Sequence, residues 1–377
     1  MSRVWRLHTK PKVSVKNKLE DKVADEIMKR KIVAIGWTLR EDIYNELTNE
    51  DKIKLEESEN SIKSDFEKYK EIIKKNSYET IRGEKKNFFN GKVNANLIRL
   101  NNLEKDDLIW IRSKGKYYLG RVTEKSHYLY AYRNSQKNSD ILKLGINNQF
   151  TDIEWYEIGD ESDVAGSIST SFIKGIALRR IKQKGSLEIS QILFNKYSKK
   201  TYYSTNKLEN NSKNFYSLLS PNDCEDLLYF FFYHKFKYIA IPSTNKTNTQ
   251  TYEFVMLSSK NRKKKIYIQV KNGDSEKIAL YLDDYLGLNG KVYLLTTGGQ
   301  IYEKKDKKEV LKIEFKNNSF MKKIGSTNTN KKIYAVNPEA LYEFAKEAYK
   351  NETILMPQSI LQWFKYLEEE KESICLI

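Results

Sequence analysis

The sequence predicts an α+β, barrel-like amino-terminal domain followed by an α/β core with a helical carboxyl-terminal extension. Short strand patterns with inserted helical patterns dominate residues 1–185, an arrangement typical of a small barrel. In residues 216–377 the pattern begins helix, strand, strand, strand, helix, strand. A polar stretch rich in Asn, Ser and Lys separates the two domains, so residues 186–215 are expected to form a linker.

The strand signals of the amino-terminal domain are apolar runs and one clear hairpin. The run KIVAIGW at 31–37 predicts a buried strand that ends at Trp37. Alternation on both sides of a Lys-Gly turn predicts a hairpin at 106–122. Apolar residues at helical spacing predict helix within 41–76. Further strands are expected at 4–7, 128–132, 152–157 and 176–180, and a helix or a long connection at 19–30.

The carboxyl-terminal domain begins with a helix-capping signal. The run SPND at 220–223 combines a cap residue, a proline for the first turn and an acidic residue, so a helix is expected from there to about residue 236. Strands are expected at 238–242, 251–257, 266–270, 291–296, 310–315 and 333–336. Helices are expected at 277–286, 338–350 and 357–370.

The charge balance of the chain favours a polyanionic partner. Its 377 residues are enough for two or three domains, and 67 Lys and Arg against 50 Asp and Glu give a formal charge of +17. The excess recurs in local clusters, which favours nucleic acid. The alternative is a source that uses lysine freely, since Asn, Ile and Tyr are abundant as well.

Several classes of protein are not expected from this sequence. No apolar run is long enough to cross a membrane and the amino terminus lacks the apolar core of a signal peptide, so a cytoplasmic protein is expected. The two cysteines give no disulfide framework, and with three widely spaced histidines they exclude a zinc site of ordinary spacing. The sequence contains no P-loop or dinucleotide-binding fingerprint.

A predicted hairpin at 251–274 carries polar residues that stand out from its apolar pattern. Side chains alternate between the two faces of a strand, so Gln269 and Lys271 share one face of the second strand. If Glu253 on the first strand shares this face, a carboxylate, an amide and an ammonium group meet. Burying such groups costs free energy unless they are paired or hold a metal ion, so this face is a candidate for chemistry.

The helix ahead of the hairpin offers a further carboxylate. Glu225 lies seven residues before Phe232, which is nearly two turns, and therefore shares the side of that ring. Asp226 instead lines up with Phe230 and Tyr233. Glu225 is the better candidate for an inward carboxylate. The alternative is that both acids simply favour the positive end of the helix dipole.

The pattern of Glu253 on one strand and Q-x-K at 269–271 on the next resembles the PD-(D/E)xK nuclease superfamily. The glutamine version is similar to the Mrr-type restriction endonucleases. The likeness covers residues 217–299, less than a quarter of the chain. It implies a restriction-endonuclease-like core whose catalytic residues are Glu253, Gln269 and Lys271, with Glu225 added from the helix.

This resemblance implies a divalent-metal-dependent endonuclease that hydrolyses double-stranded DNA in restriction or anti-phage defence. Mg²⁺ or Mn²⁺ would be held by Glu253, the amide of Gln269, the carbonyl of Val270 and Glu225. Lys271 would orient the attacking water or stabilise the phosphate. Two residues depart from the family's pattern: Glu253 stands where Asp is commoner, and Gln269 removes a negative charge, which weakens metal binding unless Glu225 compensates.

The amino-terminal domain is similar to the EVE/PUA-like barrels in an early tryptophan, the Ile-Gly-Trp run at 35–37 and the hairpin at 107–122. That likeness implies aromatic side chains that cradle a flipped, often modified, base. The candidates for base reading are Trp37, Trp110, Tyr117, Tyr118 and Trp155. The alternative is ordinary core packing, which is the commoner role of a tryptophan in a strand.

Two segments are candidates for contacts with a nucleic-acid backbone. Small residues in GSISTS at 166–171 permit close approach of backbone amides to a phosphate, which makes Ser167, Ser169 and the following Lys174 candidates. The alternative for this segment is a loop that closes the barrel. Lys263 and Lys264 lie in the basic turn expected at 258–265.

Two other functions fit the same residues. One is a catalytically inactive nucleic-acid-binding protein that uses only its basic surfaces. The other is an RNA-directed nuclease, because PUA-like barrels also act on RNA. The sequence leaves open whether the protein forms a homodimer and which base or modification it reads.

Overall fold

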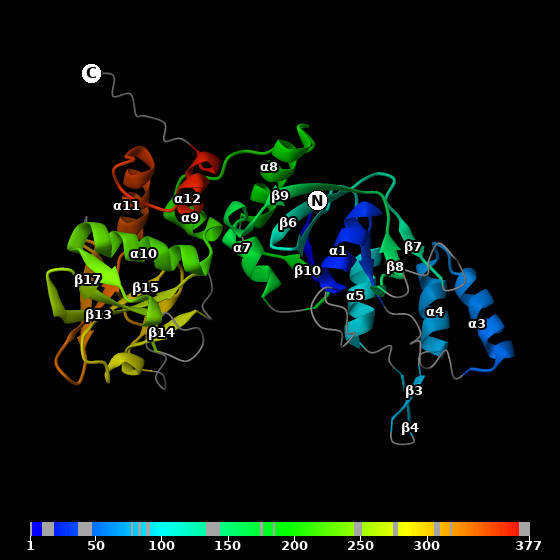
Figure 1. Ribbon diagram of the computed structural model, residues 1–377, viewed down its shortest axis with the longest axis horizontal. Helices are drawn as coiled ribbons and strands as arrows, with labels where there is room; N and C mark the ends of the chain where they lie inside the picture. The colour runs from blue at the N-terminus through cyan, green and yellow to red at the C-terminus, as the bar shows by residue number, and fades with distance from the viewer. Residues whose placement is uncertain are drawn as a thin grey trace. The chain divides into compact units, whose positions relative to one another are not determined.

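The chain folds into two compact units (Figure 1). Unit 1 comprises Met1–Val164, Ile168–Lys182 and Ser186–Thr205, and unit 2 comprises Ala165–Ser167, Gln183–Gly185 and Asn206–Ile377. The computed structural model describes residues 2–9, 19–36, 47–76, 78–81, 84–87, 91–132, 144–173, 176–183, 185–244, 251–273, 278–304, 310–316 and 319–368. Within these ranges, no helix has the length and apolar character needed to cross a membrane.

Unit 1 is organised around a five-stranded sheet in the order β10-β1-β5-β6-β9. β1 and β5 are parallel, and the other neighbours are antiparallel. A three-stranded sheet has the order β2-β8-β7, and β3 pairs with β4. The strands are β1 (Val4–Leu7), β2 (Val33–Ile35), β3 (Tyr78–Ile81), β4 (Glu84–Asn87), β5 (Leu108–Ser113), β6 (Lys116–Val122), β7 (Tyr128–Tyr130), β8 (Asn148–Phe150), β9 (Ile153–Gly159) and β10 (Leu178–Ile181).

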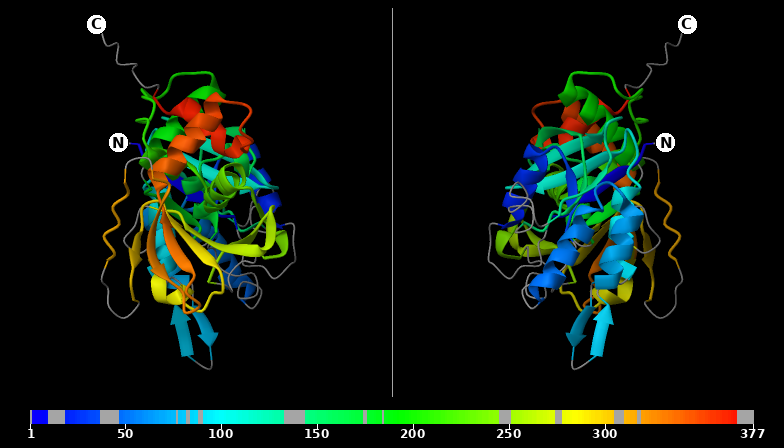
Figure 2. Two further views of the ribbon diagram at one scale, coloured as in Figure 1. Left: turned by 90° about the vertical axis from the view of Figure 1, so that its left-hand side faces the viewer. Right: turned by 90° about the vertical axis from the view of Figure 1, so that its right-hand side faces the viewer.

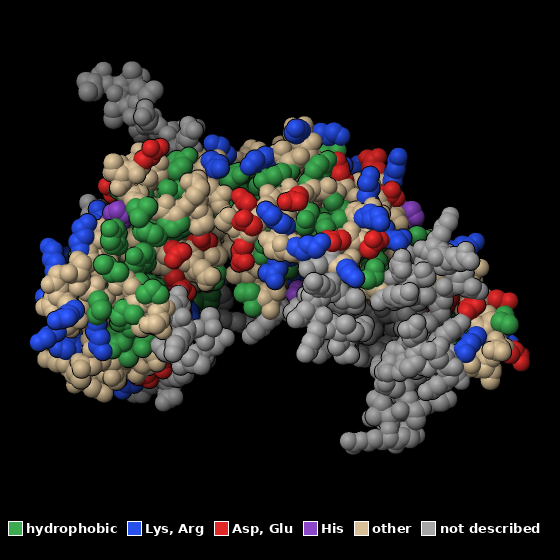
Figure 3. Space-filling view, in the orientation of Figure 1, with side chains coloured by type: hydrophobic (Ala, Val, Ile, Leu, Met, Phe, Trp, Pro, Cys, Tyr) green, Lys and Arg blue, Asp and Glu red, His purple; other side chains and the backbone are tan. Residues whose placement is uncertain are grey.

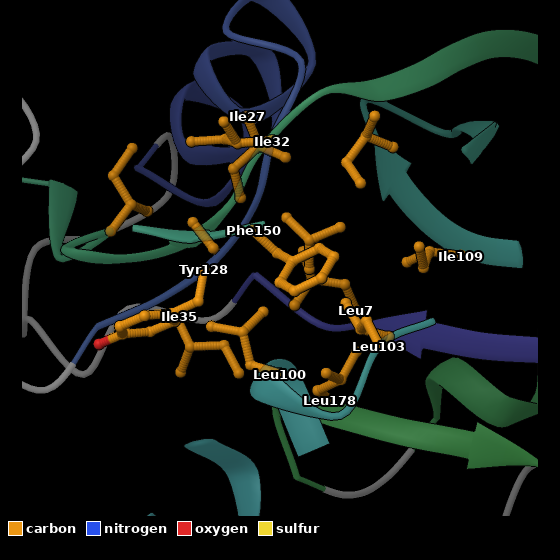
Figure 4. Packing of buried hydrophobic residues seen from close by; sticks show 14 of the residues in the cluster. Leu7, Ile27, Ile32, Ile35, Leu100, Leu103, Ile109, Tyr128, Phe150 and Leu178 are labelled. Atoms are coloured by element: carbon orange, nitrogen blue, oxygen red, sulfur yellow. The ribbon is translucent and has the colours of Figure 1, made fainter. Parts of the chain in front are cut away.

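Helices cover both faces of the five-stranded sheet. The apolar core lies on the face of Ile109, where Ile27 and Leu100 come from two helices and converge with Phe150 of the smaller sheet (Figure 4). On the other face, Phe194 of α8 contacts Tyr156 of β9, with ring centroids 5.3 Å apart. The helices are α1 (Leu19–Lys29), α3 (Asn49–Asn60), α4 (Phe66–Asn76), α5 (Gly91–Asn101) and α8 (Ser186–Ser198), with 3₁₀ turns at Glu161–Asp163 and Thr170–Phe172. The short helix α7 (Gly166–Ser169) begins in residues of unit 2 and ends in residues of unit 1.

Two expectations for the amino-terminal half of the chain are corrected. The described strands form separate sheets and no closed barrel, because helices bury both faces of the main sheet. The expected linker at 186–215 is largely helical, and it divides between the two units. Ile189, Leu193 and Phe194 of α8 are fully buried, since their spacing places them on one side of a helix.

Unit 2 contains a six-stranded sheet in the order β11-β12-β13-β15-β18-β17, seen from the side of its yellow and orange strands in Figure 2 (left). β11, β12 and β13 are antiparallel, and β13, β15 and β18 are parallel. β17 returns antiparallel to β18. The strands are β11 (Tyr238–Ala240), β12 (Phe254–Ser258), β13 (Asn261–Lys271), β15 (Lys291–Thr296), β17 (Met321–Ser326) and β18 (Lys332–Val336), and a separate parallel pair joins β14 (Ala279–Tyr281) and β16 (Gln300–Tyr302).

Helix α10 (Pro221–Phe236) covers one face of this sheet, where Phe232 meets Tyr293 with ring centroids 4.7 Å apart. It starts as the sequence predicts, with Ser220 as the cap and Asp223 completing a capping box. The expected helix at 338–350 is also confirmed as α11. The remaining helices are α9 (Ser212–Leu218), α11 (Pro338–Lys350) and α12 (Gln358–Leu361), with 3₁₀ turns at Pro242–Thr244, Leu282–Tyr285 and Gln362–Tyr366.

Three expected elements of unit 2 are wrong. The helix expected at 277–286 is β14 followed by a 3₁₀ turn, because Leu280 and Leu282 are buried at a spacing of two. The described residues of 310–315 form no strand and contribute one bridge, between Tyr302 and Val310. In place of the helix expected at 357–370, the structure has the short α12 followed by a 3₁₀ turn. The described residues of this segment end at 368.

Candidate active site

Glu253, Gln269 and Lys271 meet beside β13 because of the register between β12 and β13. Phe254 pairs with Ile268, so Glu253 lies opposite Gln269 on the same face of the sheet. Gln269 Nε2 donates a hydrogen bond to Glu253 Oε1 at 2.6 Å, and Lys271 Nζ donates to the same oxygen at 3.3 Å. The structure therefore brings together the three side chains that the sequence placed on one face.

The site lies where β13 continues beyond its partner β12. Glu253 N donates to the carbonyl of Ile268 at 2.8 Å, and β12 begins at the next residue. Carbonyl groups alternate in direction along a strand, so the carbonyl of Val270 points to the same side as that of Ile268, and it lies 3.4 Å from Gln269 Nε2. A main-chain oxygen thus joins the three side chains at this edge.

Burial decreases across the site. Gln269 is 4% exposed, whereas the side chains of Glu253 and Lys271 are 24% and 47% exposed. A partner that approaches from solvent would therefore meet the ammonium group and the carboxylate before the amide. This gradient suits a substrate that lies on the surface of the protein.

Glu225 is coupled to the site from helix α10. It is half-buried, whereas the neighbouring Asp226 is exposed. Burial raises the pKa of Glu225 to about 7, and the negative charges of Glu253 and Asp226 add to this rise. The positive charge of Lys271 acts in the opposite direction. Glu225 is therefore close enough to Glu253 and Lys271 for their charges to influence its ionisation.

Sequence reasoning missed Asn272, which ties the end of β13 to the start of α10. Its Nδ2 donates to the carbonyl of Leu219 at 2.9 Å, directly before the cap residue of the helix. Its Oδ1 accepts from Thr297 Oγ1 at 2.6 Å. Asn272 therefore fixes the strand that carries Lys271 relative to the helix that carries Glu225. The available signal was an Asn-Gly pair at the end of a strand, which is typical of a turn.

The oxygen atoms at this edge fit a hard divalent cation that keeps much of its own water. Among the described residues, no three His, Cys, Asp or Glu side chains are grouped so that they could hold a metal ion. A cation here would depend on Glu253 together with the neutral oxygens of Gln269 and Val270. A half-turn of the Gln269 amide would present its oxygen in place of the nitrogen that now faces Glu253. Mg²⁺ accepts such oxygen ligands and is commonly bound through one or two carboxylates.

Two of the aromatic residues predicted to read a base are core residues. Trp110 is fully buried, and its Nε1 donates to Ser190 Oγ of α8 at 3.0 Å. Tyr117 is also buried and packs edge-on against Phe172, with ring centroids 5.6 Å apart. Burial under other elements prevents both rings from stacking on a base, so this expectation is wrong for them.

The other base-reading candidates differ in position. Trp37 lies outside the described residues. Tyr118 and Trp155 are half-buried and pack against the core of unit 1. Trp155 also lines an open cavity of about 870 Å³ in unit 1, together with Tyr156, Tyr202 and Arg121. Trp155 therefore borders a space large enough for a ligand.

The candidates for backbone contacts are also divided. Ser167 and Ser169 lie in the short helix α7, and Ser169 is 5% exposed, so this segment is a packed helix and not a loop that closes a barrel. Lys174 lies outside the described residues. Lys263 and Lys264 are exposed. They belong to β13, which begins at Asn261, and not to a turn.

Comparisons with known proteins give no relative. No protein-family model matches the chain, and no significant match is found among curated proteins or among solved structures.

Proposed function

We propose that unit 2 is a divalent-metal-dependent nuclease that hydrolyses phosphodiester bonds, with double-stranded DNA as its substrate. The observation that carries this proposal is that Glu253, Gln269 and Lys271 meet at a partly exposed edge of the sheet. Glu253 Oε1 accepts hydrogen bonds from Gln269 Nε2 at 2.6 Å and from Lys271 Nζ at 3.3 Å. The coupling of Glu225 to the same group supports it. So does the resemblance of the E…Q-x-K pattern to the PD-(D/E)xK nucleases of the Mrr type.

Each side chain can serve phosphodiester hydrolysis in a defined way. Mg²⁺ or Mn²⁺, when bound, would neutralise phosphate charge and lower the pKa of a coordinated water. Glu253, the amide of Gln269 and the carbonyl of Val270 would hold the cation. Lys271 Nζ can donate a hydrogen bond to a phosphate oxygen or to the attacking water. Glu225, with a pKa of about 7, can give up its proton near neutral pH and supply the charge that Gln269 lacks.

The proposed setting is restriction or anti-phage defence in the cytoplasm, with unit 1 reading a feature of the DNA such as a modified base. The cavity beside Trp155 supports this part of the proposal. Stacking on one aromatic ring is worth about 1–3 kcal/mol per base, which is comparable to the cost of unstacking it.

Cleavage assays with single substitutions test the catalytic site. The protein is incubated with Mg²⁺ and with plasmids of differing modification or structured RNA. Glu253→Ala and Lys271→Ala are expected to lower the cleavage rate by about 100-fold or more while binding persists. The matched controls Glu343→Ala and Lys350→Ala remove exposed groups of the same types elsewhere in unit 2. If both site variants cleave at the rate of the parent protein, the proposed site is refuted.

A second function, nucleic-acid binding without catalysis, is favoured by one observation. Within the described ranges, no group of three or more potential acidic, histidine or cysteine ligands is present to hold a metal ion tightly. A binding protein would retain salt-dependent affinity for DNA and show no cleavage with Mg²⁺ or Mn²⁺. Cleavage of RNA in preference to DNA in the same assay would instead identify an RNA-directed nuclease.

A further inference from the structure

The end of the unit 2 sheet that lies opposite the candidate active site is strongly basic. Three segments lie there: 258–265 from the end of β12 into the start of β13, 286–291 up to the start of β15, and 326–332 from the end of β17 to the start of β18. Their sequences are SSKNRKKK, LGLNGK and STNTNKK, which contain no Asp or Glu. We call their basic residues the basic edge: Lys260, Arg262, Lys263, Lys264, Lys265, Lys291, Lys331 and Lys332.

The strand register makes the basic edge continuous. β13, β15 and β18 are parallel, so their amino-terminal ends lie at the same end of the sheet. Ile266 pairs with Lys291, and Val292 pairs with Ile333, which places Lys291 beside Lys332. Neighbouring strands are about 4.8 Å apart, so these two positively charged side chains are direct neighbours.

Two of the three segments, 286–291 and 326–332, are held together by hydrogen bonds. Asn328 N donates to the carbonyl of Leu286 at 2.8 Å, and Thr329 Oγ1 donates to the carbonyl of Leu288 at 3.4 Å. All eight basic residues are exposed, and none forms an ion pair with a carboxylate of the described residues. Figure 3 shows Lys and Arg side chains gathered along the left-hand margin of unit 2.

Adjacent like charges without a counter-charge destabilise a sheet. A polyanion would neutralise them, and Ser, Thr and Asn side chains among the lysines can donate further hydrogen bonds to phosphate oxygens. Lys265 and Lys271 are six residues apart on the same face of β13, or about 20 Å, which corresponds to about six base pairs of a duplex. One duplex on that face can therefore reach both Lys265 of the basic edge and the candidate active site.

We propose that the basic edge binds the phosphate backbone of a nucleic-acid duplex at a position about 20 Å from the scissile bond. This proposal rests on the proposed nuclease function for the identity of the polyanion, and it deepens that function by giving the substrate a second contact. In this proposal, the basic end of the sheet provides affinity for the duplex and the opposite end cleaves it. The partner is a duplex that spans both ends.

Binding measured without cleavage tests the proposal. The full-length Glu253→Ala protein binds a labelled DNA duplex of about 24 base pairs, and its dissociation constant is measured from low to moderate salt. Adding Lys291→Ala and Lys332→Ala is expected to weaken binding about tenfold or more and to lower the slope of log K against log salt by about 2. The control pair Lys207→Ala and Lys365→Ala removes two exposed lysines from the helical side of unit 2. These substitutions are expected to change neither the affinity nor the salt slope.

The outcomes separate this proposal from the proposed function. An unchanged salt slope in the Lys291 and Lys332 double variant, with its circular dichroism spectrum intact, would overturn the duplex contact even if the parent cleaves DNA. A lowered slope in a protein that shows no cleavage would retain the contact and refute the nuclease. Equal loss of affinity for anionic lipid vesicles and for DNA, with no preference for DNA in the parent, would overturn the choice of partner.

Discussion

The two ends of the unit 2 sheet differ in the sign and the pairing of their charges. At the end where β13 finishes, Glu253, Gln269 and Lys271 contact one another, and Glu225 is coupled to them. At the end where β13 begins, the basic edge carries exposed positive groups without acidic partners in the described residues. Paired polar groups suit a site whose geometry must be fixed, whereas unpaired surface charges suit long-range attraction.

The comparison shows that the kind of side chain changes with position along the strands of one sheet, and each end is proposed to have a different task. The register of β12 on β13 decides the contacts of the catalytic candidates, so a shift by one residue would move Glu253 to the opposite face. The parallel arrangement of β13, β15 and β18 decides the basic edge, because it gathers the starts of three strands. Substitutions that affect one end and not the other can test this separation.

The largest expected effect on stability comes from Asn272→Ala. Loss of the hydrogen bonds to Leu219 and Thr297 in a half-buried position is expected to lower the free energy of unfolding by about 2 kcal/mol. The tie between β13 and α10 is lost as well, so cleavage is expected to fall further than stability alone explains. Urea unfolding followed by circular dichroism measures the first effect, and single-turnover cleavage at a temperature where the variant remains folded measures the second.

The control for Asn272 is Asn289→Ala at the basic end of the sheet. Asn289 is exposed, and its substitution is expected to change stability by less than about 0.5 kcal/mol. Equal stability losses in the two variants would contradict the role of Asn272 as a tie. Unaltered single-turnover cleavage in Asn272→Ala would contradict its positioning of the site.

Glu225→Gln tests the electrostatic coupling at the acidic end through the pH dependence of stability. The pKa of Glu225 is raised from its ordinary value of 4.5 to about 7 in the folded protein. The folded state therefore retains a proton that the unfolded state releases, and this contribution to stability is lost as pH rises from about 4.5 through 7. Because the side chain is partly exposed, we expect the variant to gain about 1 kcal/mol over the parent at pH 8 and little at pH 4.

Urea unfolding at both pH values, with Glu343→Gln as an exposed control, checks this expectation for Glu225. Adding Mg²⁺ at pH 8 is expected to stabilise the parent more than Glu225→Gln, since the carboxylate can share the charge of a bound cation. A gain at pH 4 as large as that at pH 8 would show that the effect of the substitution does not depend on ionisation. The pH profile thus isolates the charge of Glu225 from its packing.

The sequence predicted the parts of unit 2 that local patterns control. Alternation placed Gln269 and Lys271 on one face, and the capping signal at Ser220 located the start of α10. Whether Glu253 shared that face depended on the cross-strand register, which brings Glu253 opposite Gln269, 16 positions away, and is visible only in the fold. Asn272 was missed for the same reason, since its partners Leu219 and Thr297 are distant in sequence.

Errors in the prediction arose where tertiary burial overrode local composition. The segment 186–215 is polar overall, yet the buried side chains of Ile189, Leu193 and Phe194 make α8 a covering helix of unit 1. Trp110 and Tyr117 are aromatic residues of the kind that can stack on a base. In the fold, however, α8 contacts Trp110 and Phe172 packs against Tyr117. The basic edge was only partly anticipated, because the adjacency of Lys291 and Lys332 depends on the pairing of β15 with β18.

The smallest expected effect on stability is that of Lys291→Glu at the basic edge. The substitution replaces a like-charge neighbour of Lys332 with an opposite charge, so the free energy of unfolding is expected to rise by about 0.5 kcal/mol at low salt. The gain should vanish at high salt, because both groups are exposed. Lys207→Glu, which lies outside this edge, should give no such gain. If duplex affinity falls while stability rises, the two properties oppose each other at this position, and the unpaired lysines are explained by binding and not by folding.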